Sequence, residues 1–152
     1  MTKKILYSFI MLLVLCACKE DTSVDPTLMP AATQSGKNTL GCLIDGWVYT
    51  GGRFGKPQAT SSADEKGNYI LIRTQVDVFT ALEFILVNPA ENTECTYTHV
   101  LFGGEKLEDG KAFITRKDGT ILSGTFSGAR IKEGRFDVRY TEEKNNGGGI
   151  AY

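Results

Sequence analysis

The chain is poor in the residues that most catalytic and metal sites need. It has one histidine, His99, among 152 residues, and it contains neither a Cys-x-x-Cys pair nor a Gly-x-Ser-x-Gly elbow. Zinc sites combine several Cys and His ligands, and an activated Ser or Cys needs a base beside it. We therefore expect no metal, no cofactor and no acyl-transfer centre. His99 could serve as a base or ligand on a face with Tyr97 and Leu101, but we expect it to be structural.

Long apolar runs and excess positive charge are also missing. The longest apolar run, Ile5 to Leu15, covers about 11 residues, whereas a membrane-spanning helix needs about 20. The formal net charge is −1, which gives no basic footprint for nucleic acid. The Gly-rich tail has no strand–GxxxxGK–helix context, so it is not a phosphate loop.

The first 18 residues are the most informative part of the chain. Lys3 and Lys4 precede the apolar run, and the run leads into Leu15-Cys16-Ala17-Cys18. This order is typical of a secretory signal peptide, and a cysteine after a small residue resembles a bacterial lipobox. A bulky leucine precedes Cys16, whereas Ala17 precedes Cys18. We therefore expect residues 1–17 to be removed and Cys18 to be lipidated; the alternative is an ordinary signal peptide.

A polar segment follows the predicted lipidation site. Residues 18–37 are rich in Thr, Ser, Asp, Pro and Ala and show no hydrophobic periodicity, which predicts a flexible tether. Lys19-Glu20-Asp21 resembles the signal that sends Bacteroidota lipoproteins to the outer face of the outer membrane; the alternative is a merely solvated linker. Loss of Lys3 and Lys4 with the signal would change the net charge from −1 to −3.

Residues 38–144 are expected to form a single all-β domain, and residues 145–152 a flexible tail. The chain has 17 Gly, 8 Phe and 6 Tyr but only 4 Pro, which suits short strands and tight turns. Two Asp-Gly pairs, Asp45-Gly46 and Asp118-Gly119, predict hairpins. About eight strands are expected, over residues 39–44, 47–50, 69–74, 80–88, 96–102, 111–117, 120–127 and 135–141, with residues 53–67 as a polar loop.

Alternation along these strands predicts the architecture. Leu82, Phe84 and Leu86 share one face of their strand. In the last strand Phe136, Val138 and Tyr140 point inward, and Arg135, Asp137 and Arg139 point outward. No amphipathic helix is evident, so consecutive hairpins favour an antiparallel β-sandwich or a small open barrel.

An opening stretch and two closing blocks of the chain resemble a known family. The opening stretch from Ala32 to Val48 contains Gly41-Cys42-Leu43-Ile44-Asp45-Gly46-Trp47, and the closing blocks are residues 124–128 and 133–140. They resemble a family of Bacteroidota lipoproteins that carries a domain-of-unknown-function label. The resemblance implies an envelope location and a β-rich fold, and it supplies no catalytic residues.

Two cysteines, Cys42 and Cys95, follow the predicted anchor. Exported proteins meet oxidising conditions, so an even pair predicts a disulfide. The alternative is a pair of buried free thiols.

The acidic residues offer few candidates for chemistry. Glu83 lies among apolar neighbours, where a carboxyl could act as an acid, but we expect it to face solvent or to pair with Arg73 or Arg116. Asp118-x-Thr120 and the loop from residue 105 to 109 carry oxygen ligands for calcium without the EF-hand spacing.

Aromatic residues supply the best binding candidates. Trp47, Tyr49 and Phe54 lie in or near the first hairpin, where exposed rings could stack on a ligand, the alternative being core packing. We therefore expect a surface-exposed outer-membrane lipoprotein that is a non-catalytic binding module and not an enzyme. Its partners would be the membrane, through acyl chains on Cys18, and a glycan or an envelope protein. The alternative is a glycan hydrolase or an accessory carbohydrate-active protein.

Overall fold

The computed structural model describes residues 28–142. The predicted signal peptide, Cys18, the first part of the tether and the C-terminal tail lie outside these residues. The described part consists of ten β-strands joined by turns and loops, and it contains no helix. No membrane-spanning helix occurs between residues 28 and 142.

The strands follow one another along the chain with short connections. They are β1 Thr39–Ile44, β2 Trp47–Gly51, β3 Gln58–Asp64, β4 Gly67–Gln75, β5 Ala81–Val87, β6 Thr93–Phe102, β7 Glu105–Leu107, β8 Gly110–Lys117, β9 Ile121–Ser127 and β10 Ile131–Glu142.

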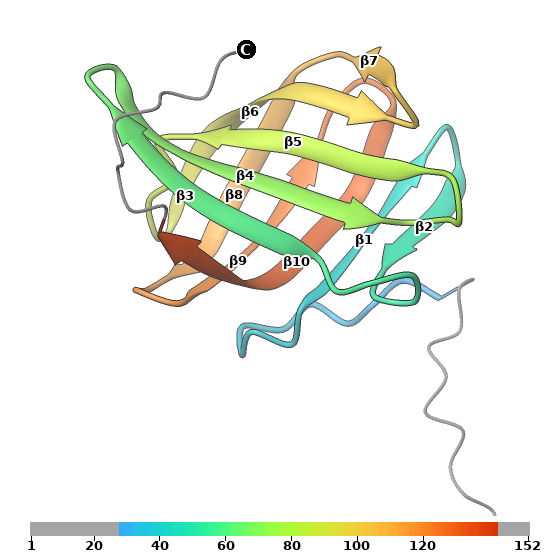
Figure 1. Ribbon diagram of the computed structural model, residues 1–152, viewed down its shortest axis with the longest axis horizontal. Coiled ribbons are helices and arrows are strands. Elements are labelled where there is room, and N and C mark those ends of the chain that lie inside the picture. The colour runs from blue at the N-terminus through green and yellow to red at the C-terminus, as the bar shows by residue number, and fades with distance from the viewer. Residues whose placement is uncertain (1–27, 143–152) are drawn as a thin grey trace, which may run out of the picture.

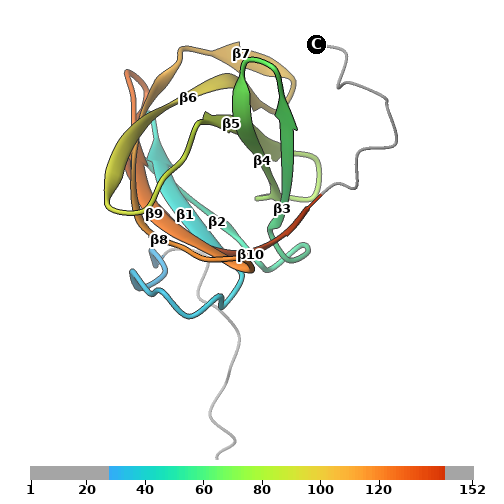
Figure 2. The ribbon, with the colours of Figure 1, turned by 90° about the vertical axis from the view of Figure 1, so that its left-hand side faces the viewer.

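Seven of these strands close into a barrel, in the order β10-β3-β4-β5-β6-β8-β9 and back to β10 (Figures 1 and 2). The neighbours are antiparallel except β10 and β3, which are parallel. One edge of β10 pairs with β9, while its other edge is shared: β1 pairs with residues 131–137 and β3 with residues 140–142. The β1–β2 hairpin and the short β7 are additions to this barrel. The all-β prediction is confirmed.

Aromatic rings fill the barrel interior. Phe84 packs against Phe126 and Tyr97, with ring centroids 4.9 and 5.5 Å apart, and Phe126 packs against Phe136 at 6.0 Å. Gly134 pairs with Phe126 across the β9–β10 ladder, and a Cβ there would strike the Phe126 ring and carbonyl oxygen. This glycine therefore makes room for the ring.

The predicted alternation holds in β5 and β10. The side chains expected to point inward are buried in both strands: Leu82, Phe84 and Leu86, and Phe136, Val138 and Tyr140. The first Asp-Gly turn is also confirmed, because Asp45 and Gly46 have φ of 51° and 85°, as a type I′ turn requires. At the second, the Asp118 carboxylate instead accepts hydrogen bonds from the N–H groups of Thr120 and Ile121.

The predicted polar loop over residues 53–67 is wrong in its second half, which forms β3. This strand reads Gln-Ala-Thr-Ser-Ser-Ala-Asp, and Ala59 is its one buried apolar residue. Its order comes from a continuous antiparallel ladder with β4. A strand that depends on its neighbour's backbone leaves little hydrophobic signal in its own sequence.

A β-bulge changes the predicted face of β6. The register with β5 shifts between Glu83 and Ile85, and His99 sits at this point with φ of 54°. A bulge inserts one residue and reverses the alternation beyond it. Tyr97 and Val100 are therefore both buried inside the barrel, and the expected face of Tyr97, His99 and Leu101 does not exist.

Candidate binding surfaces

Residues 28–38, here named the N-terminal strap, run along the outside of the barrel beneath β1, β9 and β10 (Figures 1 and 2). The expectation that residues up to 37 form a flexible tether is therefore wrong for residues 28–37. The Arg116 guanidinium donates to the Gln34 carbonyl oxygen at 2.5 Å, and Arg135 donates to that of Pro30 at 3.2 Å. Two strands thus hold the strap at separate points.

The central attachment of the strap is the carboxylate of Asp137. This side chain points out of the barrel, as predicted, yet it is only 1% exposed. Its oxygens accept hydrogen bonds from the Thr33 hydroxyl at 2.5 Å, the Ser123 hydroxyl at 2.7 Å and the Gly36 N–H at 2.7 Å. The N–H groups of Ser35 and Lys37 donate at 3.1 and 3.2 Å.

These donors stabilise the ionised carboxylate. Burial by itself raises the pKa of Asp137. Hydrogen bonds from Thr33 and Ser123 and from the N–H groups of Gly36 and Lys37 outweigh burial and lower the pKa to about 2. At neutral pH the strap is therefore attached to the barrel by a fixed negative charge.

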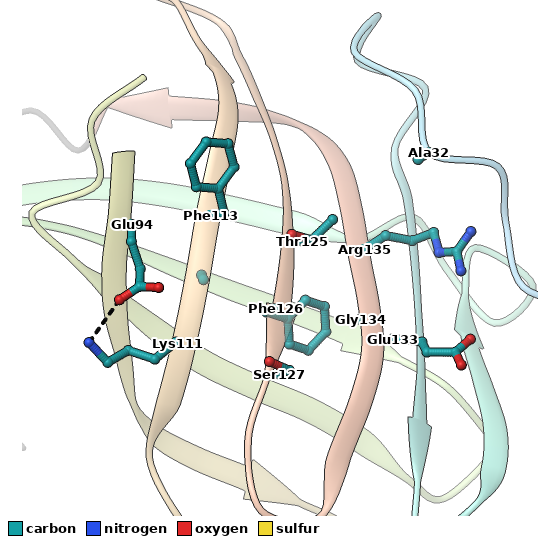
Figure 3. A pocket seen from close by; sticks show the side chains of 11 residues that line it. Ala32, Glu94, Lys111, Phe113, Thr125, Phe126, Ser127, Glu133, Gly134 and Arg135 are labelled. Atoms are coloured by element: carbon teal, nitrogen blue, oxygen red, sulfur yellow. Dashed lines mark hydrogen bonds and ion pairs between the residues drawn. The ribbon is translucent and has the colours of Figure 1, made fainter. Parts of the chain in front are cut away.

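A hollow lies on the outer face of β8, β9 and β10, beside the strap. It encloses about 510 Å³, and the side chains around it are shown in Figure 3. We name it the outer groove. Polar and aromatic side chains that line it include Glu94, Lys111, Phe113, Thr125, Ser127 and Arg135.

Strand register brings these side chains together in two rows. Glu94 pairs with Phe113, Phe113 with Thr125, and Thr125 with Arg135, so four strands contribute to one row. Lys111 pairs with Ser127 in the next row. Phe113 is 45% exposed, and Lys111 Nζ lies 3.0 Å from Glu94 Oε1. An aromatic ring is thus surrounded by hydroxyl groups and charges of both signs.

The strap forms a wall of this groove. Ala32 lines it together with the barrel residues, and a second hollow of about 60 Å³ continues beneath the strap. Ala32, Thr125 and Arg135 line both hollows. This surface was not predicted from the sequence. Alternation of Lys111 and Phe113 with buried Ala112 and Ile114 could have placed the first two on the outer face.

The predicted stacking residues lie elsewhere and differ in exposure. Trp47 is 74% exposed, so the alternative of core packing is wrong for this residue. Tyr49 is half-buried and meets Phe102 edge to face, with centroids 4.8 Å apart. Phe54 is partly exposed, and the Arg53 guanidinium carbon lies 5.5 Å from its ring centroid. Tyr49, Arg53 and Phe54 line a hollow of about 260 Å³, which Trp47 does not line.

The expected disulfide is absent. Cys42 and Cys95 are free, buried thiols. Cys42 lies on β1, next to β10, and β9 and β8 separate β10 from the β6 strand that carries Cys95. Burial raises the pKa of the Cys42 thiol to about 12 and also raises that of Cys95. Both behave as small core side chains and not as nucleophiles.

The acidic candidates are engaged in structural contacts. Glu83 pairs across strands with Arg73, with 3.6 Å between Oε2 and Nε. This agrees with the expectation that Glu83 pairs with an arginine of another strand. Backbone N–H groups of Thr120 and Ile121, followed by the Arg116 side chain, lower the pKa of Asp118 to about 2. Glu105 pairs with Arg130 at 2.7 Å.

Neither acidic stretch gathers ligands for a cation. Between residues 28 and 142, no three His, Cys, Asp or Glu side chains are grouped as a metal site would require. The Asp118 oxygens that could have served calcium are occupied: Oδ1 accepts from N–H groups of its own turn, and Oδ2 accepts from the Arg116 guanidinium.

Comparisons with known proteins identify no relative. No family model, no curated protein and no solved structure matches this chain.

Proposed function

We propose that the protein is a lipid-anchored lipoprotein of the bacterial outer membrane, displayed on the cell surface, and that it acts as a non-catalytic binding module. Cleavage before Cys18 and lipidation of its thiol follow from the Leu15-Cys16-Ala17-Cys18 pattern. Two or three acyl chains would anchor the protein firmly, because each buried CH₂ contributes about 0.8 kcal/mol of membrane affinity.

The outer groove is the proposed ligand site, and the exposed ring of Phe113 is the observation that carries the proposal. The ring lies between Glu94 and Thr125 in a row that ends at Arg135. A sugar ring has an apolar C–H face and a polar edge of hydroxyl groups. An aromatic ring beside hydroxyl and charged groups suits both parts of such a ligand. We therefore propose a glycan as the ligand class.

The barrel interior is not proposed as a ligand-binding site, because aromatic side chains fill it. The rings of Phe84, Tyr97, Phe126 and Phe136 pack against one another there. A ligand in the interior would have to displace close-packed aromatic side chains, at a large cost. The outer surface is therefore the favoured place for binding.

Catalysis is the less favoured function. A glycosidase needs two carboxyl groups about 5–10 Å apart, one of them held as an acid. Glu83, the carboxyl that sequence reasoning singled out, is ion-paired with Arg73. Two carboxyl groups, those of Glu94 and Glu133, line the outer groove, and Glu94 is paired with Lys111. An accessory carbohydrate-binding role without hydrolysis agrees with these contacts.

Affinity electrophoresis through gels that contain soluble polysaccharides tests the proposal. The wild-type protein should be retarded by at least one envelope or plant polysaccharide. Phe113→Ala should lose this retardation while keeping its β-sheet circular dichroism. Phe79→Ala, the same change at an exposed phenylalanine outside the groove, should be retarded like the wild type.

Two results would contradict the proposal. Equal retardation of the wild type and Phe113→Ala would show that the outer groove does not bind the polysaccharide. Release of new reducing ends from the polysaccharide, abolished by Glu83→Gln in a folded protein, would establish the hydrolase instead.

Cys18→Ala tests the anchor separately, since a processed variant that still partitions with membranes like the wild type would refute lipidation at this cysteine.

A further inference from the structure

Four exposed apolar side chains lie at one end of the barrel and outside the outer groove. Phe79 is 93% exposed, Trp47 74%, Val78 59% and Phe54 40%. We name these four residues the aromatic end. Isolated exposed apolar residues are ordinary, but a group of them on neighbouring connections marks an interaction surface.

The elements that carry the aromatic end are adjacent. Trp47 opens β2, Phe54 follows β2, and Val78 and Phe79 form the β4–β5 connection. The β1–β2 turn and the β4–β5 connection lie on the right-hand side of Figure 1, and the β2–β3 connection lies below them. The hollow of about 260 Å³ joins them directly, because residues of β2, Phe54 and the beginning of the β4–β5 connection line it together.

The acids of this end are engaged within the protein. Arg130 pairs with Asp45 at 2.6 Å and with Glu105 at 2.7 Å. The Asp77 carboxylate accepts a hydrogen bond from the N–H of Val78 at 2.5 Å. Arg130 offsets one of the two negative charges of Asp45 and Glu105, so contact with a lipid surface would depend on the apolar side chains and not on charge.

The beginning of the described chain lies toward the same end. In Figure 1 the blue start of the strap is on the right, below the β1–β2 hairpin. Leu28 lies 10 positions after Cys18 in the sequence. Even when fully extended, 10 residues span at most about 35 Å. A bilayer that held the acyl chains of Cys18 would therefore keep this end of the barrel within reach of its surface.

We infer that the aromatic end rests in the headgroup layer of the membrane that holds the lipid anchor. This inference depends on the proposed anchor at Cys18. Tryptophan and other aromatic side chains are favoured at the membrane–water interface, and Val78 and Phe79 offer apolar surface to the acyl boundary. The contact would fix the orientation of the barrel, whereas the acyl chains alone would fix only its distance from the membrane.

The single tryptophan of the chain makes the inference measurable, because Trp47 belongs to the aromatic end. The lipidated full-length protein is reconstituted into vesicles of phosphatidylethanolamine and phosphatidylglycerol, with either plain or brominated acyl chains. The unlipidated Cys18→Ala variant, in solution without detergent, is the reference. Relative to this reference, the fluorescence emission of Trp47 in the vesicles should shift to shorter wavelength, and vesicles with brominated acyl chains should quench it. Phe79→Ser should reduce the quenching, whereas Phe113→Ser, on the outer groove, should leave it unchanged.

Each contrary result has its own meaning. If the protein does not sediment with the vesicles, the anchor is wrong and the inference falls with it. If it sediments but brominated chains do not quench Trp47, or if Phe79→Ser quenches like the wild type, the anchor stands and the membrane contact is refuted. A wavelength shift that depends on protein concentration and not on bromination would show that a second copy covers this end, which also overturns the inference.

Discussion

Replacing the carboxylate of Asp137 should weaken both the barrel and its strap. Five groups donate hydrogen bonds to this side chain, four of them from the strap: the Thr33 hydroxyl and the N–H groups of residues 35, 36 and 37. The pKa falls from the ordinary value of 3.8 to about 2. At about 1.4 kcal/mol per pKa unit, the ionised form contributes about 2–3 kcal/mol to stability at neutral pH.

The sign of the pH dependence follows from the lowered pKa. The unfolded chain takes up a proton near pH 4, whereas folded Asp137 does so only near its pKa of about 2. The contribution is therefore complete above about pH 5 and is lost as the pH falls toward 2. Asp137→Asn keeps the shape of the side chain but not its charge. It should lower the free energy of unfolding by about 2–3 kcal/mol at pH 7 and by progressively less toward pH 2.

Urea unfolding followed by circular dichroism at several pH values measures this difference. Asp64→Asn is the matched control, because Asp64 is an exposed acid that accepts hydrogen bonds from Lys66 and Gly67, and an Asn oxygen can still accept. It should change stability by less than about 0.5 kcal/mol. Limited trypsin digestion should cut after Lys37 faster in Asp137→Asn. An unfolding difference that is constant from pH 7 to pH 2, or no difference at all, would refute the role given to Asp137.

Three further changes test the core. Cys42 and Cys95 should resist alkylation in the native protein and react completely in urea; a mass 2 Da below that of the dithiol form in protein purified without reductant would instead show a disulfide. Gly134→Ala should cost about 1–3 kcal/mol of unfolding free energy, because a Cβ there strikes Phe126; unchanged urea unfolding would contradict the close approach. Tyr97→Phe should not lower stability, since the buried Tyr97 hydroxyl has no hydrogen-bond partner among the described residues; a loss above about 1 kcal/mol would reveal a partner.

Local patterns predicted much of this fold. Alternating residues in β5 and β10 identified their buried faces, and Asp45-Gly46 identified the first hairpin turn. These features depend on residues close together in the sequence, so their signal is visible there. Closure of the barrel depends instead on β10 pairing with both β9 and β3. The sequence alone therefore left sandwich and barrel as alternatives.

The features that were missed depend on distant partners. Nothing near Asp137 in the sequence shows that it accepts hydrogen bonds from residues about 100 positions earlier, and the polarity of those residues looks like that of a linker. β3 is ordered by its ladder with β4, and the bulge at His99 has no local marker. The outer groove could be predicted only in part. Strand alternation predicts which side chains form its floor, but its wall is the strap, whose position depends on distant contacts.

The most direct test of the proposed binding function maps the ligand site by NMR. Backbone amide signals of isotopically labelled protein are recorded while a fragment of the retarding polysaccharide is added. The account predicts shifts confined to the outer groove, at Lys111, Phe113, Thr125, Ser127 and Arg135, with little change at the aromatic end. Shifts centred on Trp47, Tyr49 and Phe54, or the absence of saturable shifts with any polysaccharide, would contradict it.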